Sequence, residues 1–325
     1  MRKYLLPEGG KFYKVNMHSH TTLSDGRQTP EEVKQAYKDK GYAAVAFTEH
    51  THIHDVTHLT DEDFVAITSY EMDFADQQNT PFCFYEGKPH CFSHIEAIHL
   101  NLYSKDPHNT SIIDLAPIKE KYGKFTVETF NEAIRQAKEQ GFLVCYNHPH
   151  WSLNTYPLYS RLQGLDAIEI TNGASNRSSD NDYAPHVYDQ MARAGIRMSC
   201  YAGDDNHGTV HFFKAWTMVK ADELSYDALM GALEKGDCYA SDGPEIYELY
   251  VEDDQVTIKC SDAYGIFYTT GGRGKQCKLD ETYENPVTTA TFKINPEDYY
   301  FRINVRDARG HHANTRIYYL DELGM

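Results

Sequence analysis

Short apolar runs alternate with amphipathic segments over roughly the first 240 residues of the chain. The run KFYKVN at 11–16 alternates apolar and polar residues as a strand does, and the apolar run at 42–50 indicates a buried strand. Between them, Thr29 can cap a helix that Pro30 begins and Gly41 ends. The same patterns predict strands at 63–73, 90–103, 142–150, 165–173, 196–208 and 215–221, and helices at 126–141, 183–195 and 224–236.

This alternation of strand and helix predicts an α/β fold with a parallel sheet or a barrel. From residue 244 onward, apolar and polar residues alternate with period two between Gly, Asn and Asp turns. We therefore expect two domains, an α/β domain at 1–243 and a small antiparallel, β-sandwich-like domain at 244–325. The many tyrosines of the second domain are expected to pack in its core and across its strands.

Residues able to bind metal recur where the predicted strands end. In MHSHTTLSDG, two histidines leave the strand at 11–16 on one face, and an aspartate can fold back beside them. That segment alone suits a metal site and ordinary surface residues equally well. The recurrence favours one shared site, because active residues of such folds gather at strand carboxyl ends. The candidates are His18, His20, Asp25, His50, Glu71, His94, His148, Asp205 and His207.

The amino-acid composition of the chain limits the kinds of molecule that it is expected to bind. The chain has 325 residues, and Lys+Arg 31 against Asp+Glu 48 leaves a formal charge of −17, which disfavours nucleic acids and anionic membranes. We see no signal peptide and no apolar stretch long enough for a membrane helix. The seven cysteines are scattered and never form a CxxC pair, as expected of a protein in the reducing cytoplasm.

Six segments resemble the successive motifs of the PHP family, named after polymerase and histidinol phosphatase domains. They are HSHTTLSDG, FTEH, SYEM, SHIEAIHL, NHPH and GDDNH, and the resemblance covers about residues 12–243. It implies an irregular, TIM-like (β/α) barrel holding two or three divalent metal ions, with phosphoester hydrolysis as the usual activity. Residues 214–244 with the β tail also resemble two-domain bacterial members near the carbaryl-hydrolase-like branch.

The resemblance also implies how the ligands are shared among the ions. Glu71 would bridge the first and second ions, and the third would have its own ligands. The first would be held by His18, His20, Glu71 and Asp205, the second by Glu71, His94 and His148, and the third by Asp25, His50 and His207. Nitrogen and carboxylate ligands without thiolates suit zinc, manganese or iron, and the sequence does not choose among them.

One of the six motifs offers two possible ligands, and another differs from the family pattern at one residue. SHIEAIHL offers both His94 and His99, and its alignment on the family's strand favours His94. In FTEH, Glu49 stands where an aspartate is common, which keeps His50 as a ligand but changes its neighbour.

For the reaction, the resemblance implies a metal-activated water that attacks a small phosphomonoester or related phosphoester. Glu71, Asp205 and His207 are the expected catalytic residues, and the Asp-x-His spacing favours Asp205 over Asp204. Arg177, in the loop after EITNG, is the candidate for binding a phosphate oxygen, although an exposed loop arginine is an equal alternative.

Two other classes of function stay open. One is a metal-dependent hydrolase of a carboxylic or carbamate ester, which would not need convergent cations near Arg177 and Lys214. The other is a non-catalytic metal-binding module, which the complete ligand set argues against. Glu169 and Asn172 are expected to orient the histidines.

Overall fold

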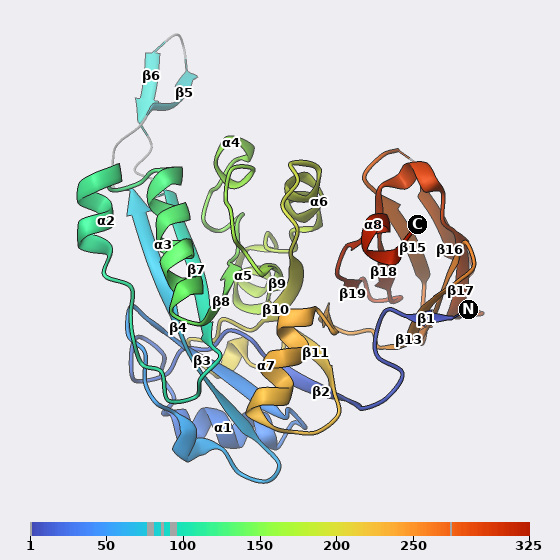
Figure 1. The fold of residues 1–325 in the computed structure, drawn as a ribbon, viewed down its shortest axis with the longest axis horizontal. Helices are drawn as coiled ribbons and strands as arrows, with labels where there is room; N and C mark the ends of the chain where they lie inside the picture. The colour runs from blue at the N-terminus through green and yellow to red at the C-terminus, as the bar shows by residue number, and fades with distance from the viewer. Residues whose placement is uncertain (1, 77–80, 86–87, 92–95, 274) are drawn as a thin grey trace.

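The computed structural model describes residues 2–76, 81–85, 88–91, 96–273 and 275–325, and its larger sheet runs through both halves of the chain (Figure 1). Its strand order is β10-β9-β8-β7-β4-β3-β2-β11-β12-β19-β18-β15-β16. The strands of the α/β part are β2 (Lys11–Asn16), β3 (Ala44–His50), β4 (Val65–Asp76), β7 (Glu96–Ser104), β8 (Phe142–Tyr146), β9 (Ala167–Asn172), β10 (Ser199–Gly203), β11 (Trp216–Ala221) and β12 (Cys238–Ser241). A separate hairpin joins β5 (Pro81–Tyr85) to β6 (Lys88–Cys91).

Helices cover the sheet of the α/β part, and their ends follow local sequence signals. Thr29 caps α1 in a capping box with Glu32, and Thr126 caps α3. The buried stripe of α3, which includes Phe130 and Ile134, belongs to a large apolar core with residues of the sheet. No described helix is both long and apolar enough to cross a membrane. The helices are α1 (Pro30–Lys38), α2 (Leu115–Tyr122), α3 (Val127–Glu139), α4 (Tyr156–Tyr159), α5 (Gly173–Ser179), α6 (Pro185–Arg193) and α7 (Tyr226–Lys235).

The sheet is mixed rather than wholly parallel. β2, β3 and β4 run parallel to one another, as do β8, β9 and β10, and β7 runs antiparallel to both β4 and β8. The predicted parallel order is wrong for β7, because the described part of the chain between β4 and β7 forms a hairpin and contains no crossover helix. β11 is likewise antiparallel to β2. At one edge of the sheet, the amino end of β7 therefore lies beside the carboxyl ends of β2, β3, β4, β8, β9 and β10.

The ends of β2 and β10 approach each other at this edge without a continuous ladder between them. A single parallel bridge pairs Ser19 with Asn206, and the Asp205 N–H donates to the His18 carbonyl at 2.9 Å. Gly203 permits this approach, because a Cβ atom there would lie 2.6 Å from the Cβ of His18. The described strand pairing thus shows an α/β sheet whose two halves touch at the site edge.

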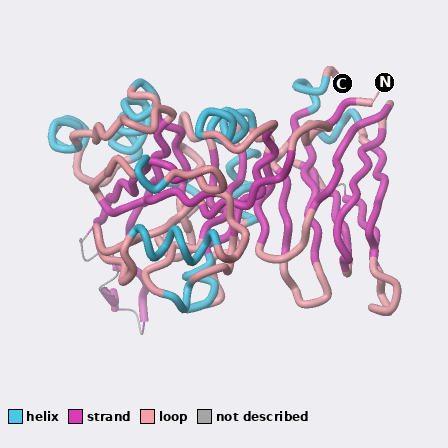
Figure 2. Tube along the Cα trace, turned by 90° about the horizontal axis from the view of Figure 1, so that it is seen from below, coloured by secondary structure: helices cyan, strands magenta, loops and turns pink. Residues whose placement is uncertain are grey.

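The tail adds antiparallel strands to the same molecule, with both chain ends on its side (Figures 1 and 2). β19 pairs with β12, so the large sheet continues into the tail. A second sheet has the order β1-β13-β14-β17, and one apolar cluster contains residues of both sheets. The boundary at residues 243 and 244 stays a prediction. The tail elements are β13 (Ile246–Glu252), β14 (Gln255–Ala263), β15 (Gly265–Thr270), β16 (Lys275–Leu279), β17 (Val287–Lys293), β18 (Tyr300–Arg306), β19 (His312–Thr315), β20 (Tyr318–Tyr319) and α8 (Leu320–Leu323), with β1 (Lys3–Tyr4) added from the N-terminus.

A buried ion pair joins the tail to helix α6. Arg302 of β18 donates from Nε and Nη2 to the two carboxylate oxygens of Asp189, at 2.7 and 2.9 Å. The two side chains are only 6% and 10% exposed. Removing one partner from such a pair leaves the other charge buried without compensation.

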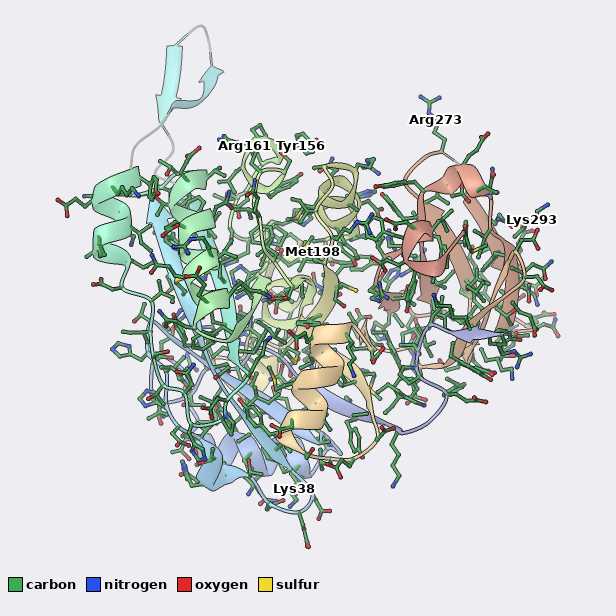
Figure 3. All side chains as sticks on the ribbon, viewed as in Figure 1. Lys38, Tyr156, Arg161, Met198, Arg273 and Lys293 are labelled. Carbon is green, nitrogen blue, oxygen red and sulfur yellow. The ribbon has the colours of Figure 1, made fainter. Side chains whose placement is uncertain are left out.

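We expect Arg302→Met to lower the free energy of unfolding by about 3–5 kcal/mol, because Asp189 would remain buried and unpaired. Urea denaturation followed by circular dichroism measures this loss. Arg273→Met is the matched control, since Arg273 projects from the tip of the tail (Figure 3) and its loss should change stability by no more than about 0.5 kcal/mol. Equal stabilities of the two variants would contradict the role of the pair.

Candidate metal centre

Glu71 of β4 lies at the centre of the predicted site. Its side chain is 1% exposed, and its two oxygens face different imidazoles. Oε1 lies near the side-chain nitrogens of His99 at 3.1 Å, His148 at 3.3 Å, His18 at 3.4 Å and Asn147 at 2.8 Å. Oε2 lies 3.1 Å from Nδ1 of His50 and 3.5 Å from Nε2 of His20. One carboxylate thus faces two sets of nitrogen donors.

Asp205 completes one side of this cluster. Its Oδ1 lies 3.0 Å from Nε2 of His20 and 3.4 Å from Nε2 of His18, and those two ring nitrogens are 3.1 Å apart. Asp205 has a left-handed backbone, with φ of 50°, which turns its carboxylate toward the histidines. Asp204 faces the other way, where its carboxylate accepts hydrogen bonds from Tyr37 Oη and from backbone N–H groups of the loop at 213–215. The structure therefore brings Asp205, and not Asp204, to the cluster.

Asp25 gathers a further set of histidines at the more exposed side. Its Oδ2 lies 3.2 Å from Nε2 of His207 and 3.6 Å from Nε2 of His50, while Oδ1 lies 3.7 Å from Nδ1 of His20. Glu49 holds the preceding segment of this loop, since its carboxylate accepts hydrogen bonds from Thr21 and Ser24. The residue that departs from the family pattern thus positions the loop of Asp25.

Two cluster residues were not among the preferred candidates. His99, the less favoured of two alternatives, pairs with Asp73 across β7 and β4, and His94 lies outside the part of the chain that the structure describes. Asp73 contributes Oδ2 at 3.0 Å from Nδ1 of His50. Asp73 could have been predicted from the Glu-x-Asp spacing of SYEMD, because alternate residues of a strand lie on the same face.

A second set of polar groups orients the imidazoles. The Glu169 carboxylate lies 3.0 Å from Nδ1 of His18, which leaves Nε2 of that ring facing the cluster. The Asn172 amide donates to Glu169 at 2.9 Å and to Asp205 at 3.1 Å. The expected contact of Glu169 with a histidine is therefore present, while Asn172 contacts the carboxylates of Glu169 and Asp205 instead of a histidine.

The donor geometry fits divalent ions. Ligand atoms about 2.0–2.2 Å from one ion lie roughly 3.0–3.5 Å from each other, and most of the distances above fall in or near that range. Nδ1 of His20 is buried and has no hydrogen-bond partner among the described residues, although it points toward Asp25. Imidazole and carboxylate donors suit first-row transition metals. The part of the chain that the structure describes contains four groups in which the ligand atoms lie within 4.8 Å of one another: His20, Asp25, His50 and His207; His50, Glu71, Asp73 and His99; His18, Glu71 and His148; and His18, His20 and Asp205.

The electrostatics of the cluster also favour bound positive charge. Burial opposes ionisation of Glu71, but neighbouring imidazoles, that of His99 first, hold its pKa well below the ordinary value. Despite burial, nearby carboxylates raise the pKa values of His50 and His148 to about 9. Burial lowers the pKa of His20. The carboxylates thus attract cations to a buried site, whether protons or metal ions.

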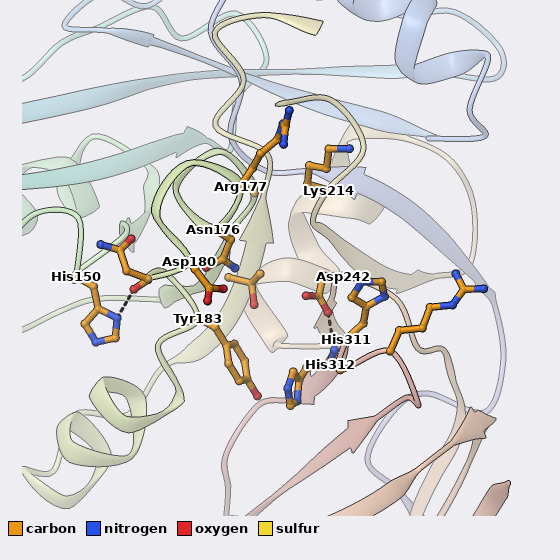
Figure 4. A pocket seen from close by; sticks show the side chains of 14 residues that line it. His150, Asn176, Arg177, Asp180, Tyr183, Lys214, Asp242, His311 and His312 are labelled. Carbon is orange, nitrogen blue, oxygen red and sulfur yellow. Dashed lines mark hydrogen bonds between the residues drawn. The ribbon is translucent and has the colours of Figure 1, made fainter. Parts of the chain in front are cut away.

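Arg177 lies outside this cluster. It occupies the last turn of α5, so the expectation that it belongs to a loop is wrong. Asn172 caps this helix by accepting a hydrogen bond from the Ser175 N–H, a helix start that the predicted elements did not include. Arg177 and Lys214 line a neighbouring cavity (Figure 4).

Comparison with known proteins identifies the family. The family model described as the PHP domain matches residues 16–284. The chain belongs to the PHP domain family. The expected PHP family is therefore confirmed, while placement near the carbaryl-hydrolase-like branch stays a prediction. No curated protein matches the chain.

Solved structures similar to this PHP protein share little sequence with it. A two-domain protein from Bacteroides vulgatus, described as containing a predicted PHP-like metal-dependent phosphoesterase, is 17% identical over 98% of this chain and 90% of that chain, with a TM-score of 0.45. An amidohydrolase from Chromobacterium violaceum, with bound sulfate and no metal, is 14% identical over 60% of this chain and 88% of that chain, with a TM-score of 0.37.

We expect Asp205→Asn to reduce the number of divalent ions bound per chain, because an amide replaces a charged ligand. Asp204→Asn should leave the metal content unchanged but lower the melting temperature, because Asp204 holds the loop at 213–215. Elemental analysis after loading with Mn²⁺ or Zn²⁺, together with thermal denaturation, separates the two effects. Metal loss in the Asp204 variant alone would contradict the placement of Asp205.

Proposed function

We propose that this PHP protein is a metal-dependent phosphoesterase that hydrolyses a small phosphomonoester or a related phosphoester. The observation that supports this most is the buried Glu71 carboxylate, whose two oxygens face separate sets of imidazoles. A bridging carboxylate of this kind suits two ions roughly 3.5–4 Å apart, the spacing common in metal-dependent phosphatases. The proposal includes two or three divalent ions, of zinc, manganese or iron.

We assign the ligands from the contacts around each carboxylate. His99 takes the position that the resemblance gave to His94, because it lies beside Glu71 and Asp73. Asp73 is an additional candidate ligand on the same side as His50. The first ion would be held by His18, His20, Glu71 and Asp205, the second by Glu71, His99 and His148, and the third by Asp25, His50 and His207.

Bound divalent ions would polarise a phosphoryl oxygen and lower the pKa of a bound water. The protein's own residues determine where that chemistry takes place. The Glu169 carboxylate, 3.0 Å from Nδ1 of His18, favours a proton on that nitrogen, which would leave Nε2 to bind an ion. Asn147 donates to Glu71 and limits the rotation of its carboxylate. Arg177, which lines the neighbouring cavity, is our candidate for contacting a phosphate oxygen through its planar guanidinium.

The irregular (β/α) barrel is part of the same proposal. The bridge between Ser19 and Asn206 and the hydrogen bond from Asp205 to His18 support it, because they join the two halves of the sheet at the site edge. In a barrel of this kind the catalytic residues come from the carboxyl ends of several strands. Residues far apart in the sequence would then act on one substrate.

Glu71→Gln should lower turnover of the best phosphoester by more than about a thousandfold, on the order of 4 kcal/mol of transition-state stabilisation. Glutamine keeps the volume but removes the charge that two sets of ligands share. The measurement is steady-state hydrolysis of a panel of phosphomonoesters, phosphodiesters, carboxylic esters and carbamates by the metal-loaded protein. Circular dichroism checks that the variant is folded.

His58→Gln is the matched control, because His58 is exposed and lies outside the four candidate metal groups. Its turnover should stay within about twofold of the native value, as expected for a surface substitution. Hydrolysis of carboxylic or carbamate esters without any phosphoester would overturn the proposed substrate class. A Glu71 variant that is folded and fully active would overturn the proposed centre.

A further inference from the structure

A cavity of about 820 Å³ lies between the α/β part and the tail (Figure 4). Arg177 of α5 and Lys214 lie together on one side of it, and His311 and His312 of the tail lie on another. Arg309 also lines it from the tail. Its volume is in the range of pockets that hold a small-molecule ligand.

Short stretches of chain connect this cavity to the candidate metal centre. His150 lines the cavity two residues after His148, and Gly173 lines it directly after Asn172, which contacts Asp205. Consecutive Cα atoms lie about 3.8 Å apart, so these parts of the wall are within roughly 8 Å of cluster residues along the chain. Parts of the cavity wall therefore lie next to cluster residues along the chain.

The wall that carries the cations is tightly packed. A Cβ atom on Gly173 would lie 2.8 Å from Cβ of Lys214 and 2.9 Å from Oδ1 of Asp204. Helix α5, with Arg177, therefore packs directly on the loop that Asp204 anchors and that carries Lys214. Only glycine permits this approach, so α5 and the loop of Lys214 pack closely, and each contributes one cation to the cavity lining.

The tail presents its own cation from an ordered turn. The Asp307 carboxylate accepts hydrogen bonds from the backbone N–H groups of Arg309 at 2.8 Å and His311 at 2.9 Å. Gly310, between them, has φ of +92°, which glycine adopts readily. The next ring, His312, stacks on Tyr183 of the α/β part at 4.3 Å. The turn is thus fixed against the opposite wall.

The charges of this cavity differ from those of the rest of the chain. Within the described residues, the side chains of Arg177, Lys214 and Arg309 form no hydrogen bond or ion pair, although the chain carries a formal charge of −17. Asp180 and Asp242 also line the cavity, and Asp242 already accepts a hydrogen bond from the His312 N–H. Unpaired cations on both walls, with polar acceptors between them, suit a hydroxylated anion.

Resting on the proposed function, we propose that this cavity binds the leaving group of the substrate and that Arg309 of the tail binds an anionic group at its far end. The substrate class is then a phosphomonoester of a hydroxylated acid, with the reacting phosphate at the metal centre. Carboxylate and amide side chains along the cavity, such as Asp180 and Asn176, can pair with the hydroxyls. The tail therefore supplies part of the substrate site.

Two probes differ only at the end that the tail would bind. 6-Phosphogluconate ends in a carboxylate, and glucitol 6-phosphate ends in a neutral hydroxymethyl group. For the native, Mn²⁺-loaded protein we expect the ratio of their kcat/KM values to be about tenfold or more in favour of the acid. Arg309→Met should lower this ratio at least fivefold, and Arg309→Lys should retain most of it because the charge remains.

Arg273→Met is the control, since Arg273 lies at the distant tip of the tail (Figure 3) and should leave the ratio unchanged. A native ratio near one, or a ratio that Arg309→Met lowers less than fivefold, overturns the inference. If neither compound is hydrolysed, the binding of both compounds to the native protein and to each variant is measured by calorimetric titration. The tenfold and fivefold thresholds then apply to the ratio of the two Kd values. The experiment can therefore reject the proposed phosphoesterase activity and the binding of an anionic group by Arg309 independently of each other.

Discussion

A carboxylate that is buried in a protein needs compensating positive charge, and Glu71 meets that requirement with imidazoles from several strands. Its oxygens lie within 3.5 Å of ring nitrogens of His18, His20, His50 and other histidines. Without such neighbours, the cost of removing the charge from water would oppose folding of β4 in this position. Burial of Glu71 therefore requires nitrogen donors around its carboxylate, and the same residues form a set of candidate metal ligands.

Much of this site could be predicted from the sequence, because strand patterns and polar strand ends are local features. Repetition of that arrangement predicted that His18, Glu71 and Asp205 would meet, and the structure brings them together. The antiparallel direction of β7 could not be predicted in this way, since it depends on how the chain returns after β4. For the same reason, the pairing of His99 with Asp73 required the three-dimensional structure.

The tail is more closely joined to the α/β part than a change of sequence pattern alone would indicate. The large sheet continues from β12 into β19, and the ion pair of Arg302 with Asp189 crosses between the two parts. The stack of Tyr183 on His312 lies in the same region, beside the cavity. Fixed contacts of this kind hold the cavity walls in place, which reduces the cost of ordering them when a ligand binds.

The position of metal ions relative to Glu71 tests the central claim most directly. Crystals grown with Mn²⁺ and measured for anomalous scattering would locate each ion independently of any activity. The account predicts at least two peaks in the cluster, with two of them on different oxygens of Glu71 at about the 2.0–2.2 Å expected for metal–carboxylate bonds. Fewer than two peaks, or peaks that do not contact Glu71, would contradict it.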